Sequence, residues 1–108
     1  MIEADQSSEA VSRTGEFLEE NPYSQDAQKL LGEILMFREE NEKAISAFRK
    51  AIGLNRQSPV PYRNLGLALR AVGDESGAQQ VFRRGISEVV GDEYSRSLLR
   101  SYLLPGET

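Results

Sequence analysis

The sequence contains no cysteine and no histidine among its 108 residues. These absences exclude disulfide bonds, catalysis by a thiolate or an imidazole, and most zinc sites, because these two residue types supply the necessary groups. No apolar run approaches the roughly 20 residues that a membrane-spanning helix needs, and no basic start followed by an apolar core indicates a signal peptide. We therefore expect a cytoplasmic protein that does not associate with membranes.

The composition is that of one folded domain, with 39% hydrophobic and 28% charged residues. The formal net charge of −4 argues against binding to the phosphate backbone of nucleic acids. The negative charge is local, since residues 1–24 carry six acids and one base, whereas the remaining chain carries eleven acids and twelve bases. An acidic segment therefore precedes a nearly neutral one.

Residues that could support catalysis form no convincing arrangement. The pairs Glu19/Glu20 and Glu39/Glu40 are neighbours in sequence, and neighbouring helical residues do not face one another across a substrate. The charged run from Arg38 to Lys43 is interpreted as a solvated turn rather than a metal site, and no glycine-rich phosphate loop is visible. We expect no enzyme activity, no metal and no cofactor.

Two segments of the chain repeat one another at a constant spacing. "LGEILMFREENEKAISAF" begins at Leu31 and "LGLALRAVGDESGAQQVF" begins at Leu65. A fixed period of this size is typical of stacked helical repeats. The residues that recur unchanged are Leu31/Leu65, Gly32/Gly66, Leu35/Leu69, Ala44/Ala78, Phe48/Phe82, Arg49/Arg83 and Ile52/Ile86.

The repeated segments have the apolar spacing of helices and the residues that begin and end them. Ser24, Ser58 and Asp92 are N-cap residue types that recur with the same period, and Gly73 and Gly91 suit helix ends. Apolar residues recur three and four positions apart between these signals. The pattern predicts helices over residues 25–37, 42–54, 59–72 and 75–90.

This pattern resembles the tetratricopeptide repeat, in which small and aromatic residues recur at fixed positions of a 34-residue unit. The matching residues are Gly32, Ala44, Phe48 and Ala51 in one unit and Gly66, Ala78, Phe82 and Gly85 in the next. An aromatic residue of the family pattern is matched by Tyr62 but not by Gln28. Leu35 and Leu69 stand where the family has tyrosine, and Arg56 and Val90 stand where it has proline.

The resemblance implies an all-α fold of about six helices, stacked as antiparallel pairs into a right-handed solenoid. Residues 1–108 then form one domain. Residues 1–24 are the second half of a repeat, with a helix over 7–20, and 25–58 and 59–92 are full repeats. Residues 93–108 contain a C-terminal capping helix over 93–104. Arg100 replaces the small residue that a following helix would require, which favours a cap.

The resemblance also implies a concave groove lined by the first helix of each repeat, where members of the family bind peptides or proteins. Lys29, Arg63 and Arg70 favour an acidic ligand, and Asp26 and Glu33 oppose it. The candidate binding residues are Lys29, Glu33, Met36, Phe37, Arg63, Asn64, Leu67 and Arg70. The other groove positions are Asp26, Leu30, Val60, Ala71, Tyr94, Ser97, Leu98 and Ser101.

Some members of the family hold the C-terminal carboxylate of chaperones with a clamp of lysine, asparagine and arginine residues. Lys29 and Asn64 match that clamp, whereas Glu33, Tyr94 and Leu98 do not. Glu33 would repel a carboxylate, and the two missing cations would remove much of the attraction. The sequence therefore disfavours this specific ligand.

Two functional interpretations stay open at this level. The first is a protein interaction module that presents its groove to a peptide or protein partner. The second is a structural or oligomerisation element, or a part of a longer repeat protein. Apolar residues in 7–20, including Ala10, Val11, Phe17 and Leu18, lack a first helix of their own to pack against. They predict an exposed apolar patch and self-association as a homodimer.

Overall fold

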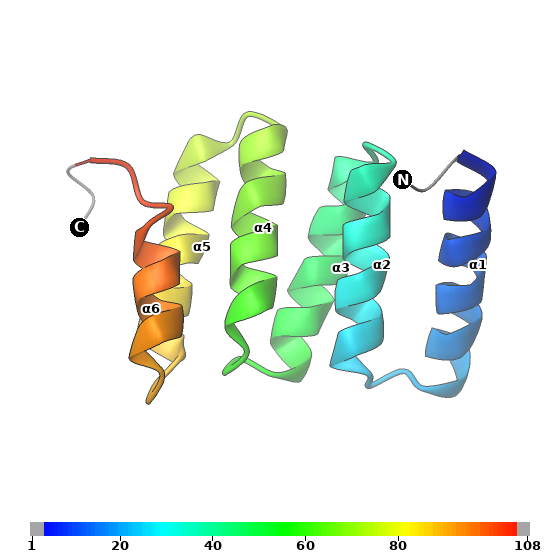
Figure 1. Cartoon of the computed structure of the whole chain (residues 1–108), viewed down its shortest axis with the longest axis horizontal. Helices are drawn as coiled ribbons and strands as arrows, with labels where there is room; N and C mark the ends of the chain where they lie inside the picture. The colour runs from blue at the N-terminus through cyan, green and yellow to red at the C-terminus, as the bar shows by residue number, and fades with distance from the viewer. Residues whose placement is uncertain (1–3, 106–108) are drawn as a thin grey trace.

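The computed structural model describes residues 4–105, which form six α-helices and no strand (Figure 1). The helices are α1 (Ala4–Glu20), α2 (Gln25–Phe37), α3 (Asn41–Leu54), α4 (Pro59–Ala71), α5 (Glu75–Glu88) and α6 (Glu93–Arg100). Each helix packs on the next along the chain, in a body of 42 × 28 × 21 Å. Figure 1 shows them in order from α1 at one end to α6 at the other, with α2 in front of α3 and α6 in front of α5. The predicted all-α fold of six helices is confirmed.

Two of the three predicted N-caps close their helices through a side chain. Ser24 Oγ accepts a hydrogen bond from the Ala27 amide at 3.2 Å, and Asp92 Oδ1 accepts one from the Ser95 amide at 3.1 Å. Ser58 occupies the N-cap position of α4 without a side-chain hydrogen bond. Gly73 has a φ of 89°, a left-handed conformation that suits glycine and ends the helical path after α4.

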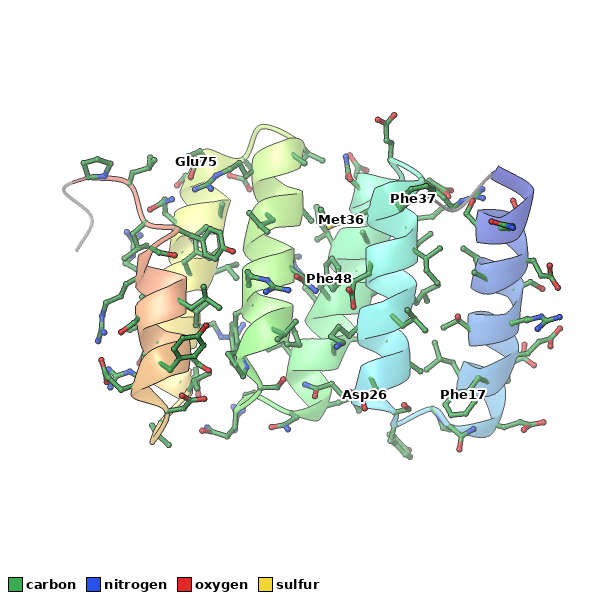
Figure 2. All side chains as sticks on the ribbon, in the orientation of Figure 1. Phe17, Asp26, Met36, Phe37, Phe48 and Glu75 are labelled. Atoms are coloured by element: carbon green, nitrogen blue, oxygen red, sulfur yellow. The ribbon has the colours of Figure 1, made fainter. Side chains whose placement is uncertain are left out.

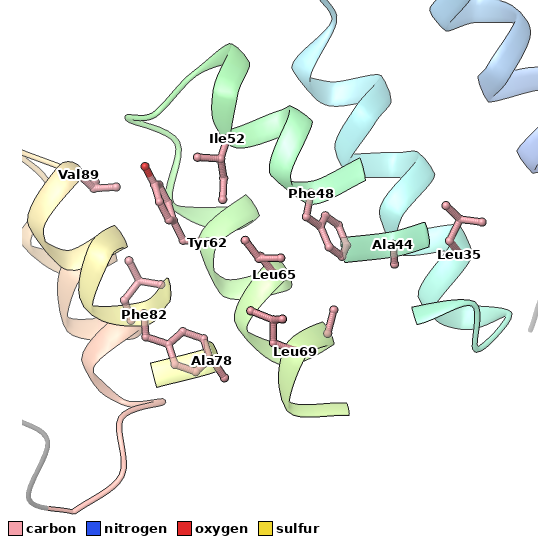
Figure 3. Close-up of a cluster of buried hydrophobic side chains, with 12 residues drawn as sticks. Leu35, Ala44, Phe48, Ile52, Tyr62, Leu65, Leu69, Ala78, Phe82 and Val89 are labelled. Atoms are coloured by element: carbon pink, nitrogen blue, oxygen red, sulfur yellow. The ribbon is translucent and has the colours of Figure 1, made fainter. Parts of the chain in front are cut away.

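The core lies both within and between the helix pairs and is built largely from the repeated residues. Phe48 and Phe82 are fully buried, each against the glycine of the preceding helix, Gly32 or Gly66 (Figure 3). A Cβ atom on either glycine would collide with the facing ring. The absence of a side chain at these glycines therefore allows the two helices of a pair to approach closely. The residues of the core cluster are Leu35, Ala44, Phe48, Ile52, Tyr62, Leu65, Ala68, Leu69, Ala78, Phe82, Val89 and Leu99.

The predicted helix over 93–104 was wrong at its end, because α6 stops at Arg100. The amides of Tyr102 and Leu103 then donate to carbonyls three residues earlier, which tightens the chain into a turn. The turn is held from outside the helix, since Arg70 Nη2 donates to the Tyr102 carbonyl at 3.0 Å and the Tyr102 ring stacks on Phe82. Contacts with α4 and α5 thus replace the last predicted helical turn.

The predicted helix over 75–90 was also too long, since α5 ends at Glu88. The side chain of Gln57 makes hydrogen bonds to the residues before and after this helix end. Its Nε2 donates to the Glu88 carbonyl at 2.7 Å, and its Oε1 accepts from the Val90 amide at 3.2 Å. Val89 takes an extended conformation and is 2% exposed. Burial of Val89 and the bonds to Gln57 stop the helix before Gly91. The helix predicted over 7–20 instead begins at Ala4.

Candidate functional site

The eight candidate binding residues lie on α2 and α4, which contact each other across the molecule. Lys29, Glu33 and Met36 follow three-and-four spacing along α2, and Arg63, Leu67 and Arg70 do the same along α4. Residues at this spacing share one side of a helix. The two rows form the surface that we call the groove face. Met36 and Phe37 are labelled near one end of α2 in Figure 2, and Asp26 near the other.

The groove face has an accessible apolar component on α2. The side chains of Leu30 and Phe37 are each 48% exposed, and their spacing of seven residues places them on the same side of α2. Met36 and Leu67 are half-buried because they pack against the core cluster. Leu30 and Phe37 are therefore the residues of α2 that offer apolar area to a ligand.

The charged component of the groove face is weaker than the sequence suggests. The guanidinium of Arg70 forms a bidentate ion pair with the Glu75 carboxylate of α5. Its Nε lies 2.7 Å from Oε1, and its Nη2 lies 2.9 Å from Oε2. Hydrogen bonds from Arg70 and then Gln79 lower the pKa of the Glu75 carboxyl, so this pair stays charged near neutral pH. The Arg70 guanidinium also lies over the Phe82 ring, 5.4 Å from its centroid. Arg70 thus holds α4, α5 and the turn at Tyr102 together.

Lys29 and Arg63 remain the more available cations of this surface. Lys29 Nζ lies 4.0 Å from Glu33 Oε1, a loose pair on an exposed helix side. Arg63 directs Nε and Nη2 to Asn64 Oδ1 at 3.3 and 3.2 Å, which are long hydrogen bonds. Asn64 itself is 6% exposed, so it orients Arg63 rather than meeting solvent.

The remaining groove positions are mostly solvated. Tyr94 is 79% exposed on the first turn of α6, whereas Val60 and Leu98 are half-buried. This arrangement gives a shallow surface with apolar residues toward α2 and an exposed aromatic ring toward α6. The exposed polar or small members are Asp26, Ala71, Ser97 and Ser101.

A hollow of about 450 Å³ lies between α1 and α2, next to the groove face. The sequence did not locate this hollow. Phe17 of α1 is 50% exposed beside it, and Leu30 lines it from α2. Thr14 stands on α1 where α3 and α5 carry Phe48 and Phe82, so a large side chain is missing here. The predicted apolar exposure of Phe17 is confirmed, and in Figure 2 it is labelled on α1 near the end where Asp26 lies on α2.

Other kinds of site find no support among residues 4–105. Within residues 4–105, no group of three or more acidic, cysteine or histidine side chains lies close enough to hold a metal ion. No helix of this part of the chain is both long enough and apolar enough to cross a membrane.

The fold resembles that of solved helical repeat proteins. Neither a protein-family model nor a curated protein sequence matches the chain. The crystal structure of MamA superposes with a TM-score of 0.73 and 25% identity, covering 89% of this chain and 58% of MamA. A structure of the CopN–Scc3 complex superposes with a TM-score of 0.68 and 13% identity, covering 93% of this chain and 68% of that one. Both structures are helical repeat proteins of the tetratricopeptide type. The fold of this chain is therefore tetratricopeptide-like.

Proposed function

We propose that this chain is a protein interaction module that binds a peptide or protein segment on the groove face. The observation that carries the proposal is the half-exposed pair Leu30 and Phe37, because accessible apolar side chains of this size commonly mark contact surfaces. The structural likeness to tetratricopeptide-type proteins, one of them solved in a complex, supports the same class of function.

The ligand that suits this surface combines apolar side chains with a few acidic ones. Lys29 and Arg63 attract carboxylates, whereas Asp26 and Glu33 weaken the field, so charge contributes modestly. Exposed pairs are screened beyond a Debye length of about 8 Å at physiological salt. Apolar contact with Phe37 and Leu30 then supplies most of the affinity, and charge supplies orientation and association rate.

The experiment is affinity capture from a lysate with quantitative mass spectrometry, comparing the full chain with two double variants. Lys29→Glu with Arg63→Glu reverses the two available cations of the groove face. Arg49→Glu with Arg56→Glu makes the same charge change at exposed positions outside it. A genuine groove partner is lost with the first variant and retained with the second. Partners that respond equally to both variants would refute the groove as the binding surface.

The second candidate function is self-association through the end of the molecule at α1. It is favoured by the hollow between α1 and α2 and by the exposure of Phe17 beside it. A second copy that places an apolar side chain in this hollow would cover both Phe17 and Leu30. Five of the six charged residues in α1 are acidic, so the contact must leave them at its rim.

Light scattering at two concentrations tests this second function. Phe17→Ser removes the exposed ring, and Val90→Ser removes an apolar side chain that is 70% exposed at the other end of the molecule. Self-association through α1 predicts a concentration-dependent mass that Phe17→Ser abolishes and Val90→Ser preserves. A constant monomer mass across the two concentrations would exclude it.

A further inference from the structure

A second cavity, of about 490 Å³, opens on the side of α2 that turns away from the groove face. It lies between α1 and α3, with α2 as its floor. Val11, Leu31 and Ala47 give it apolar walls, and Gln28 contributes an amide. Its volume falls in the range of about 300–1,000 Å³ that is usual for ligand pockets. Nothing in the groove proposal uses this surface.

The next repeat explains why this space is empty. Gln28 occupies the position in its repeat that Tyr62 occupies in the next, and Tyr62 is completely buried on α4. Tyr62 packs on Gly85 and donates its hydroxyl hydrogen to the Arg56 carbonyl at 2.9 Å. Glutamine is smaller and has no ring. The cavity therefore lies beside the position at which the second repeat carries an aromatic ring.

The side chains that form the walls of the cavity are also smaller than their counterparts in the next repeat. Val11 and Ala47 correspond to Ile45 and Val81 one repeat later, and each is smaller than its counterpart. Three positions thus lose volume together. Coordinated loss of volume around one point leaves a defined recess instead of a uniformly loose core.

The side-chain oxygen of Gln28 has no hydrogen-bond donor. This Oε1 atom is buried and accepts no hydrogen bond from the described part of the chain. A buried acceptor without a donor is unfavourable, because it has given up its hydrogen bonds to water. A donor that entered the cavity would relieve this cost once the amide turned toward it.

The rim of the cavity is positively charged. Lys43, Lys50 and Arg38 line it, opposed by the single carboxylate of Glu40. Glu40 is already bound by Arg38 at 2.6 Å and by Lys43 at 3.3 Å. Lys50 is exposed. The rim therefore presents a net positive charge to an incoming ligand.

Lys50 has an informative counterpart in the next repeat. Arg84 occupies the same position one repeat later, and its guanidinium lies over the Tyr62 ring, 5.9 Å from the centroid. A cation beside an aromatic face is attracted by the ring quadrupole. The preceding repeat keeps the cation of this pair, as Lys50, but has Gln28 in place of the aromatic ring.

We propose that this cavity binds a tyrosine side chain from an acidic peptide segment of a partner protein. The ring takes the place that Tyr62 takes one repeat later, beside Lys50. The tyrosine hydroxyl donates to Gln28 Oε1, and carboxylates flanking the tyrosine approach Lys43 and Lys50. This cavity lies on the side of α2 away from the groove face, so the chain holds two independent binding surfaces.

The test uses a blocked peptide, Glu-Asp-Glu-Tyr-Glu-Asp, titrated into the full chain labelled with ¹⁵N. The expected result is a set of amide shifts at Val11, Leu31 and Ala47, and at least about tenfold weaker binding of the peptide in which alanine replaces tyrosine. No shift at those amides at about 1 mM peptide, a concentration that detects even weak binding, would overturn the proposal.

Variants locate the peptide on the protein. Gln28→Tyr fills the cavity from within and is expected to weaken binding by at least about tenfold. Lys50→Glu is expected to weaken it as well, and it changes only an exposed side chain, so the test survives if Gln28→Tyr fails to fold. Arg49→Glu is the matched control, because Arg49 is exposed beside Lys50 in sequence but does not line the cavity.

The groove variant separates this proposal from the proposed function. Lys29→Glu with Arg63→Glu is expected to leave binding of the tyrosine peptide unchanged. If that variant abolishes binding while Gln28→Tyr and Lys50→Glu preserve it, the peptide occupies the groove face. That outcome would overturn the proposed site in the cavity and would support binding on the groove face.

Discussion

Gly32 and Gly66 show how one hydrogen atom in place of a side chain sets the distance between two helices. Each faces the ring of a phenylalanine on the following helix, Phe48 or Phe82, and both rings are fully buried. Cores are packed nearly as densely as organic crystals, so neither ring has room to withdraw. The repeated glycine is required by this contact and by no turn or loop.

We expect Gly66→Ala to lower the free energy of unfolding by about 1–3 kcal/mol, because the added methyl group collides with the Phe82 ring. The measurement is urea denaturation followed by circular dichroism. Gly53→Ala is the matched control, since a Cβ at Gly53 in α3 meets no atom within 4 Å. That control should gain about 0.5–1 kcal/mol from helix propensity. Equal effects of the two variants would show that Gly66 is not at a tight contact.

The pair of Arg70 and Glu75 joins α4 to α5 and also holds the chain after α6. Because hydrogen bonds from Arg70 lower the pKa of the Glu75 carboxyl below its ordinary value of 4.5, folding favours the ionised form. Such a group contributes stability above its unfolded pKa and loses it as the pH falls through the folded pKa. The fold therefore keeps the contribution of this pair at neutral pH and loses it in acid.

We expect the urea midpoint of Glu75→Gln to fall less than that of the parent chain when the pH is lowered from about 6 to about 3. Arg70→Gln should reduce the pH dependence in the same way, because Arg70 is the largest cause of the lowered pKa. Parallel midpoint curves for the parent and Glu75→Gln would contradict a lowered pKa at this carboxyl.

The short helix α6 illustrates how an element depends on its first turn. It has only eight residues, too few to be stable alone in water. Asp92 accepts hydrogen bonds from the Ser95 amide at 3.1 Å and from Ser95 Oγ at 2.6 Å, and these bonds lower the pKa of its carboxyl. Burial of Leu99 then attaches the helix to the core.

We expect Asp92→Ala to destabilise the protein by about 1 kcal/mol, since the variant loses the N-cap of α6. Ser58→Ala is the matched control, because Ser58 is the N-cap of α4 but makes no side-chain hydrogen bond there. Its effect should stay within a few tenths of a kcal/mol. Thermal or urea unfolding measures both, and an equal loss in the two variants would show that the Asp92 side chain does not cap α6.

At the scale of the whole molecule, the helices form a row in which each element is stabilised by its neighbours. α4 packs against α2, α3, α5 and α6, whereas α1 packs against α2 alone. In repeat proteins stability is close to a sum of units and nearest-neighbour contacts. The end of the row at α1 is therefore its least supported part.

We expect amides of α1 to exchange with solvent deuterium at least about tenfold faster than those of α4, because α1 opens by losing contact with one helix only. Native-state hydrogen exchange read by NMR resolves the two helices. Amides of α5 serve as the reference for global unfolding. Equal protection of α1 and α4 would mean that the molecule opens as a single cooperative unit.

The sequence by itself determined the helical class, the order of the helices and the recurrence of Gly32/Gly66 and Phe48/Phe82 that the core uses. These features follow from local apolar spacing and from the repeat period that separates Leu31 from Leu65, and both act over short distances along the chain. Ser24 and Asp92 were predicted as N-caps for the same reason, and their side chains do cap α2 and α6. For the candidate site, the sequence indicated which residues share a side of α2 and α4.

Only the tertiary structure decided which of those residues stay accessible. Arg70 is a groove cation in sequence, but its pairing with Glu75 depends on how α4 meets α5. The end of α6 depends on the Tyr102 ring reaching Phe82, and the cavity beside Gln28 depends on α1 and α3 standing apart. These outcomes depend on distances between helices. Local periodicity constrains each helix but not the volume that side chains leave between helices.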